Sequence, residues 1–249
     1  MKLTPEQISF FLDKGYIVQP GLFPLELIRK LGAEIDGLHE KMAANAPKTV
    51  HVSWEDGQPA DRPKRIRQLM HSEKVSPILD AMSRSDAMLD IIEQLIGPGI
   101  YLFHSKLMMK AARDGTFTPW HQDWGYWQHH TKRPSQVNCM LAIDPNVKAN
   151  GALRFVEGSH KAGPIDHKTF VSASFNIGLE GDIDSKESTM VELQPGDAVF
   201  FGPLVVHGSA ANTSDFDRRA NTFAFDVPDN NTGQQMPEEY HRRGSKSGT

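Results

Sequence analysis

Two histidines and one aspartate are the most informative residues in the sequence, because their side chains are good ligands for a divalent metal ion. His121 and Asp123 are separated by one residue, and His207 lies far downstream. Residues i and i+2 of a strand point to the same face, so His121 and Asp123 could both reach one metal ion. Two imidazoles and one carboxylate are the ligand set of non-haem iron(II) oxygenases. A His-x-Asp pair also arises by chance on surfaces, so the hypothesis depends on the third residue.

His207 supplies that support. It follows the turn residues Pro195-Gly196-Asp197 and the apolar run Ala198–Val206, which together predict a turn leading into a buried strand. A histidine at the end of such a strand needs a partner, because burying an unpaired polar group is costly. We therefore predict that His207 completes the metal site begun by His121 and Asp123.

Arg218 lies eleven residues after His207, a spacing that suits a hairpin returning beside the end of the strand. An arginine that points into a barrel is costly unless it binds a carboxylate, which its planar guanidinium can grip through two hydrogen bonds. Strand alternation turns only one of Arg218 and Arg219 inward. The other interpretation is that Arg218 is a surface residue like its neighbour.

The segment Ile100–Lys110 is predicted to be a strand that places Leu102, His104, Lys106 and Met108 on one face. Either this face looks into the cavity near the metal, or it is a solvated sheet face. Four aromatic residues surround the first ligand pair and would either pack the core or wall a pocket against water: Trp120, Trp124, Tyr126 and Trp127.

Two kinds of secondary structure divide the chain. Residues 1–98 are predicted to be mainly helical, with Thr4 and Gln7 as a capping box and Pro47–Arg67 as a loop. Short apolar runs separated by turn signals follow, which favours a sandwich or barrel. The strands expected there are Ile100–Lys110, Gln136–Ile143, Leu153–Val156, Thr189–Leu193, Ala198–Val206 and Arg219–Val227. The polar tail Asp229–Thr249 is expected to be disordered or to act as a flap.

Composition limits the partners of the protein. The 249 residues carry a formal net charge of −4 without a basic block, which argues against nucleic acid. No apolar stretch approaches the roughly 18 residues of a membrane span. Cys139 is the only cysteine, so no intrachain disulfide can form. This fits a reducing compartment, and we expect a cytoplasmic protein that acts on a small molecule. The oligomeric state is not indicated.

The ordered motifs resemble the phytanoyl-CoA dioxygenase family of iron(II)- and 2-oxoglutarate-dependent oxygenases. The resemblance is strongest from Trp120 to Arg218 and rests on His121-Gln122-Asp123, Asn150-Gly151-Ala152-Leu153, Glu157-Gly158-Ser159-His160, Leu193-Gln194-Pro195-Gly196-Asp197, His207-Gly208-Ser209, Asn212-Thr213-Ser214 and Arg218. It implies a mainly β fold with flanking helices, whose core is a double-stranded β-helix, the cupin-like jelly roll. We therefore expect one oxygenase domain over residues 1–249, with a helical flank (1–98), a jelly-roll core (99–228) and a polar tail (229–249).

The resemblance also implies the chemistry. Fe(II) would be bound by His121, Asp123 and His207, and the cosubstrates would be 2-oxoglutarate and O2. Arg218, helped by Ser209, would hold the far carboxylate of 2-oxoglutarate, and the further cosubstrate contacts would be Lys106, His104 and Trp127. The expected reaction is oxidation, most simply hydroxylation, of a small molecule at an unactivated C–H bond, with release of succinate and CO2. Related halogenases have a small residue at the carboxylate position, so the presence of Asp123 favours hydroxylation. The family does not share one substrate.

Three other interpretations remain open at this point. The chain could be a catalytically silent jelly-roll binding protein, or a metal hydrolase, such as a zinc enzyme, that uses the same ligands with bound water. A cupin-type oxygenase without 2-oxoglutarate is the third, although its usual His-x-His pair is missing. The hydrolase would have no need of Arg218, and the complete set of metal-binding residues together with Arg218 argues against the silent binding protein.

Overall fold

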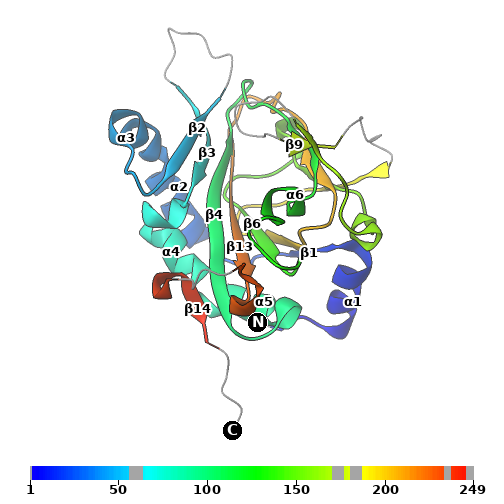
Figure 1. Cartoon of the computed structure of the whole chain (residues 1–249). Coiled ribbons are helices and arrows are strands. Elements are labelled where there is room, and N and C mark those ends of the chain that lie inside the picture. Colours follow the sequence, from blue (N-terminus) through cyan, green and yellow to red (C-terminus); the bar gives the residue numbers. More distant parts are fainter. Residues whose placement is uncertain (1, 56–63, 170–176, 180–186, 233–236, 245–249) are drawn as a thin grey trace.

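Two antiparallel β-sheets face each other in a computed structural model, which describes residues 2–55, 64–169, 177–179, 187–232 and 237–244 (Figure 1). The larger sheet has eight strands in the order β1-β11-β6-β13-β4-β3-β2, with β14 also paired to β4. Its strands are β1 (Tyr16–Gln19), β2 (His51–Trp54), β3 (Ile66–Met70), β4 (Ile100–Lys110), β6 (Val137–Ala142), β11 (Ala198–Phe201), β13 (Arg218–Asp226) and β14 (His241–Arg243).

The smaller sheet has the order β10-β7-β12-β5 and closes the barrel. Its strands are β5 (Thr118–His121), β7 (Leu153–Phe155), β10 (Thr189–Val191) and β12 (His207–Ser209), and a separate short pair is formed by β8 (Lys168–Thr169) and β9 (Ile177–Gly178). An apolar cluster fills the space between the sheets, with Met140 from the large sheet and Phe155 from the small one. This arrangement confirms the expected jelly roll.

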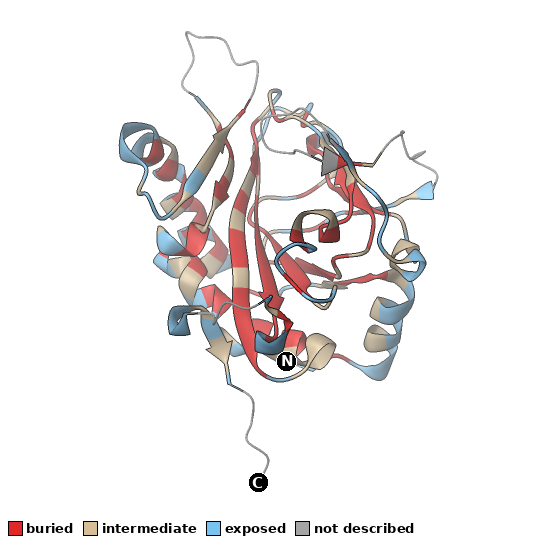
Figure 2. Ribbon diagram, viewed as in Figure 1, coloured by how far each residue is buried: buried red, intermediate tan, exposed pale blue. Residues whose placement is uncertain are grey.

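Helices cover the outer face of the large sheet, as Figure 1 shows for α2, α3 and α4 beside β4. A second and larger apolar cluster lies between this face and the helices, and Figure 2 shows the covered strands as buried. The longer helices are α1 (Pro5–Lys14), α2 (Leu25–Asp36), α3 (Leu38–Asn45), α4 (Pro77–Ser83) and α5 (Asp86–Ile96). Helix α1 begins with the expected capping box of Thr4 and Gln7 and ends at Gly15, whose φ of 88° favours glycine. No described helix is long and apolar enough to cross a membrane.

The helical flank also contains strands, which the sequence-based expectation missed. β1 lies between α1 and α2, and β2 and the start of β3 occupy parts of the predicted loop Pro47–Arg67. Residues 56–63 of that loop lie outside the described residues. These short strands pair with partners distant in sequence or at the sheet edge, such as β1 with β11, so local periodicity does not reveal them.

The predicted strand Ala198–Val206 is also wrong in its second half. β11 ends at Phe201, and the chain turns before β12 begins at His207 in the other sheet. His207 therefore begins a strand instead of ending one. The segment between β12 and β13 likewise connects the two sheets and is not a hairpin, since β13 pairs with β4 and β6.

A bulge in β4 changes the face on which its first residues lie. Ala224 of β13 pairs with His104, but the next residue, Phe225, pairs with Leu102, so Phe103 is the extra residue. Leu102 consequently packs in the helix-side cluster, and Phe103 packs against Trp127 on the barrel side. The prediction that Leu102 shares a face with His104 is therefore wrong, whereas His104 and Lys106 do lie on the barrel side.

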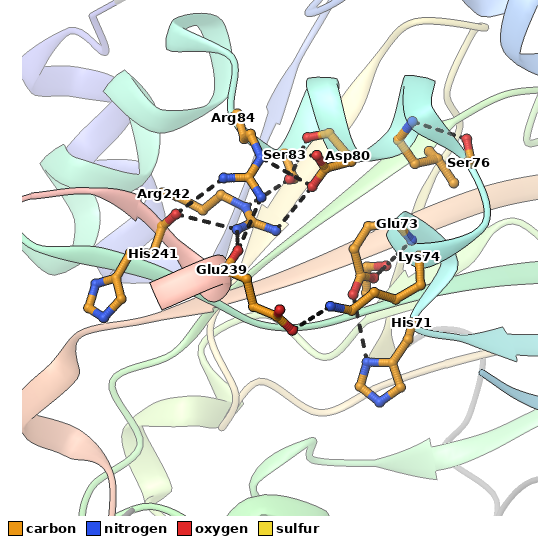
Figure 3. A network of polar contacts seen from close by, with 12 residues as sticks. His71, Glu73, Lys74, Ser76, Asp80, Ser83, Arg84, Glu239, His241 and Arg242 are labelled. Atoms are coloured by element: carbon orange, nitrogen blue, oxygen red, sulfur yellow. Dashed lines mark hydrogen bonds and ion pairs between the residues drawn. The ribbon is translucent and has the colours of Figure 1, made fainter. Parts of the chain in front are cut away.

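The polar tail is described at residues 229–232 and 237–244, and its second segment docks against η1 (Ser72–Lys74), α4 and β4 (Figure 3). The Arg242 side chain is almost completely buried, and its Nε donates a 2.9 Å hydrogen bond to the Ser83 hydroxyl. Lys74 donates to Glu239 at 2.6 Å, which joins the tail to η1. This part of the tail is thus a fixed edge of the fold and not a flap.

Candidate active site

His121, Asp123 and His207 come together at one end of the barrel, and all three are buried. His121 is the last residue of β5, and the Cα atoms of His121 and His207 are register partners between β5 and β12. Asp123 lies just beyond β5, before the short helix α6 (Trp124–Trp127), and not on the strand itself as expected. One ligand atom from each residue lies within 4.8 Å of the others, which is the spacing that a shared metal ion requires.

The two imidazole rings are oriented by the backbone. His121 Nδ1 lies 2.8 Å from the Pro119 carbonyl oxygen, and His207 Nδ1 lies 3.0 Å from that of Val205. A carbonyl can only accept, so each Nδ1 carries the proton and each Nε2 is the nitrogen that can coordinate a metal ion. His121 Nε2 is 3.5 Å from Asp123 Oδ1, and His207 Nε2 is 3.7 Å from Asp123 Oδ2. Both Nε2 atoms therefore lie beside the Asp123 carboxylate.

The charge states of this cluster also suit a metal ion. Burial, reinforced by the neighbouring His121, lowers the pKa of His207 to about 3. Burial alone would raise the pKa of the Asp123 carboxyl, but its electrostatic interactions with His207 and Lys106 hold that pKa well below its ordinary range. A carboxylate beside an uncharged imidazole is the protonation state that a divalent metal requires.

Arg218 is the first residue of β13 and lies at the end of the inner barrel face away from the His-Asp-His cluster. Its surroundings suit the binding of a carboxylate. Its side chain is 3% exposed, Nη1 donates to Asn146 Oδ1 at 3.0 Å, and Nε has no hydrogen-bond partner among the described residues. Burial lowers its pKa to about 10, so it stays charged at neutral pH. A buried guanidinium with an open N–H group fits the far carboxylate of 2-oxoglutarate.

Lys110 connects Arg218 with Ser209. Lys110 is the register partner of Arg218 between β4 and β13, and its Nζ donates to the carbonyl oxygens of Thr116, Ser209 and Ala210. The end of β12, which carries Ser209, is therefore held against the start of β13. The sequence does not single out Lys110, because two of its three carbonyl partners, Ser209 and Ala210, lie 99 and 100 residues away.

The other predicted cosubstrate contacts lie between these two ends or beside the metal ligands. The inner face of β13 presents Ala220, Thr222 and Ala224, and the register partners of Thr222 and Ala224 on β4 are Lys106 and His104. Trp127 is buried in α6, with its ring 5.5 Å from that of His104. The structure thus brings all eight selected residues to the barrel side of the large sheet or to β5, β12 and α6, which face it.

Gln122 and His167 support the ligand-bearing turn but were missed as functional residues. The Gln122 side chain donates to the carbonyl oxygens of Gly163 and Leu204 and accepts from the Ile165 amide. The backbone N–H of Gln122 in turn donates a hydrogen bond to His167 Nε2 at 2.8 Å. The position of Gln122 between His121 and Asp123 could have indicated its supporting role. Nothing near His167 in the sequence indicates that it contacts Gln122.

Known proteins are similar to this chain over most of its length. Residues 11–220 match the family model described as phytanoyl-CoA dioxygenase (PhyH). An L-proline trans-4-hydroxylase of Streptomyces griseoviridis is 28% identical over 219 residues, which are 80% of this chain and 78% of that protein. The human peroxisomal phytanoyl-CoA dioxygenase is 27% identical over 232 residues, covering 88% of this chain and 67% of that protein.

A similar fold is found in the crystal structure of EctD from S. alaskensis with 2-oxoglutarate and 5-hydroxyectoine. The TM-score is 0.74 at 19% sequence identity, and the match covers 98% of this chain and 86% of that one. At this identity the likeness concerns the fold, whereas the family model spans most of the chain. The chain therefore belongs to the phytanoyl-CoA dioxygenase family, and it is a non-haem iron(II)- and 2-oxoglutarate-dependent dioxygenase.

Proposed function

We propose that the protein hydroxylates a small molecule at an unactivated C–H bond. The observation that carries this proposal is the pairing of a complete His-Asp-His cluster with a buried, incompletely bonded Arg218 on the inner face of the same barrel. When bound, iron, 2-oxoglutarate and O2 supply an oxidant that can attack such a bond, with release of succinate and CO2. The protein supplies binding, orientation and exclusion of water.

In this proposal His121, Asp123 and His207 hold the iron. Arg218 and Ser209 hold the far carboxylate of 2-oxoglutarate, which would satisfy the open N–H of the Arg218 guanidinium. Lys106, His104 and Trp127 are further contacts of the cosubstrate. Lys106 suits this role because its charge already acts on Asp123 and His207 at the metal site.

Two features support hydroxylation of a small molecule. Asp123 supplies a carboxylate at the position where related halogenases have a small residue, so the iron keeps three protein ligands. The names of the relatives also include hydroxylases of small molecules, such as the proline hydroxylase. A metal hydrolase or a silent binding protein would leave the buried charge of Arg218 without a carboxylate to bind.

Succinate formation tests the proposal. The purified protein is reconstituted with Fe(II) without oxygen, then given 2-oxoglutarate, O2 and a panel of amino acids, acyl compounds and other metabolites. We expect one class of compound to raise succinate formation and to gain 16 mass units, and His121→Ala to abolish both effects. Product that forms without succinate, or equally fast with His121→Ala, would overturn the proposal.

A further inference from the structure

Asn138 is a polar exception on an apolar surface. It lies on β6, is 0% exposed, and has Ala224 and Phe201 as register partners on the neighbouring strands. The next two residues on the same face of β6, Met140 and Ala142, belong to the apolar cluster inside the barrel. A buried amide in this position needs a reason beyond packing.

The only side-chain hydrogen bond of Asn138 among the described residues goes to the metal site. Its Nδ2 donates to Asp123 Oδ2 at 2.8 Å, and its Oδ1 is buried without a partner. The orientation of the amide follows from chemistry, because an ionised carboxylate can only accept and must therefore face the NH2 group. Within the described residues, the Asn138 side chain is therefore linked by a hydrogen bond to Asp123 alone.

We infer that Asn138 is a positioning residue that fixes the rotation of the Asp123 carboxylate. Holding Oδ2 leaves Oδ1, which lies 3.5 Å from His121 Nε2, as the oxygen free to bind the metal. Hydrogen bonds of this kind to a ligating carboxylate orient it and raise its affinity for the metal. The inference rests on the proposed function, since it assumes that Asp123 is a metal ligand.

Asn221 provides a matched control. It is also 0% exposed in the same sheet, on β13, and it is also half-bonded: Oδ1 accepts from the Ser72 hydroxyl at 2.7 Å, whereas Nδ2 has no partner in the described chain. Ser72 belongs to η1, so Asn221 faces the helices and not the barrel interior. If the role of Asn138 were purely structural, substitutions at Asn138 and Asn221 should both lower the melting temperature and leave metal binding unchanged.

The test measures binding of Co(II), a spectroscopic substitute for Fe(II), in the full chain without 2-oxoglutarate. We expect Asn138→Leu to weaken Co(II) binding by roughly 10- to 100-fold and to shift the visible absorption bands of the bound ion. Asn221→Leu should lower the melting temperature but bind Co(II) with the affinity and spectrum of the wild type. If Asn138→Leu does not fold, Asn138→Ala serves for the same comparison.

Wild-type affinity and spectrum in a folded Asn138 variant would overturn the inference. The variant His121→Ala separates this failure from failure of the proposed function. If His121→Ala loses Co(II) while the Asn138 variant binds normally, only the positioning role is wrong. If His121→Ala also binds Co(II) like the wild type, the metal site itself is wrong.

Discussion

Arg218 and Arg219 are neighbours in β13, and their guanidinium groups lie on opposite faces of the large sheet. Arg218 is buried on the barrel side and bonds to Asn146. Arg219 lies on the helix side, where it binds the Asp144 carboxylate, the Gly32 carbonyl and Asp36 of α2. Strand alternation alone predicted that only one of the pair turns inward, and the structure identifies it as Arg218.

Arg218→Ala should therefore impair use of 2-oxoglutarate without affecting the metal. Loss of a charged partner in a buried site costs about 2–5 kcal/mol, so the apparent KM for 2-oxoglutarate should rise by roughly 30-fold or more. Lysine should substitute poorly, because its ammonium does not match the shape of a carboxylate. Steady-state kinetics at varied 2-oxoglutarate measure the KM, and iron affinity without cosubstrate should stay unchanged.

Arg219→Ala is the control for this experiment. It should leave the KM and the iron affinity close to those of the wild type, as strand alternation indicated. The structure adds that it should lower the melting temperature, since Arg219 links β13 to Asp144 and α2. A large rise in KM for Arg219→Ala, with none for Arg218→Ala, would contradict the assignment of the cosubstrate site.

The parts of the fold that the sequence predicts are those whose signal is local. Short apolar runs between turn signals located β4, β6 and β13, and the order of motifs pointed to the jelly roll. The face of Leu102 was wrong because one extra residue, Phe103, enters β4 opposite a regular partner strand. A bulge of this kind depends on pairing, which is invisible in one strand alone.

The cluster of His121, Asp123 and His207 was predictable for a similar reason, since two of these residues are separated by one position and the third follows an apolar run. Their supports were not. Asn138 and His167 each contact the ligand-bearing turn from a segment that is distant in sequence, and neither is part of a recognisable motif. Such residues are found only when the packing of the chain is known.

His121→Ala and His207→Ala should each abolish iron binding or activity. The rings donate to the carbonyl oxygens of Pro119 and Val205, and alanine at either position leaves the backbone pairing of β5 with β12 in place. Equilibrium dialysis with Fe(II) under anaerobic conditions measures binding, and succinate release measures turnover. Wild-type turnover in either variant would show that the residue is not a ligand.

Asp123→Gly should eliminate hydroxylation. The substitution removes the only carboxylate of the described His-Asp-His cluster and opens one coordination position, at which chloride could bind. Product analysis with and without chloride measures the outcome. Hydroxylation at the wild-type rate would mean that Asp123 does not bind the metal.

The metal-free protein should lose stability as the pH falls from about 7 to 5, and His104 should contribute to this loss. His104 is 8% exposed, and burial, with a contribution from the positive charge of Lys106, lowers its pKa to about 3. The unfolded chain has the ordinary histidine pKa of about 6.5. Between these two values the unfolded state binds a proton that the folded state does not, so acid favours unfolding by up to about 1.4 kcal/mol per pH unit.

The corresponding variant is His104→Leu, which removes the buried imidazole without leaving a large cavity. Urea unfolding at pH 7.5, 6 and 5 should show that this variant loses less free energy of unfolding on acidification than the wild type, by on the order of 1–2 kcal/mol at pH 5. The exposed His129, just after α6, is the control, because His129→Gln removes an imidazole that folding does not bury. This control should follow the wild-type pH dependence. Identical pH dependence in the wild type and His104→Leu would mean that the folded protein accepts a proton on His104 as readily as the unfolded chain does.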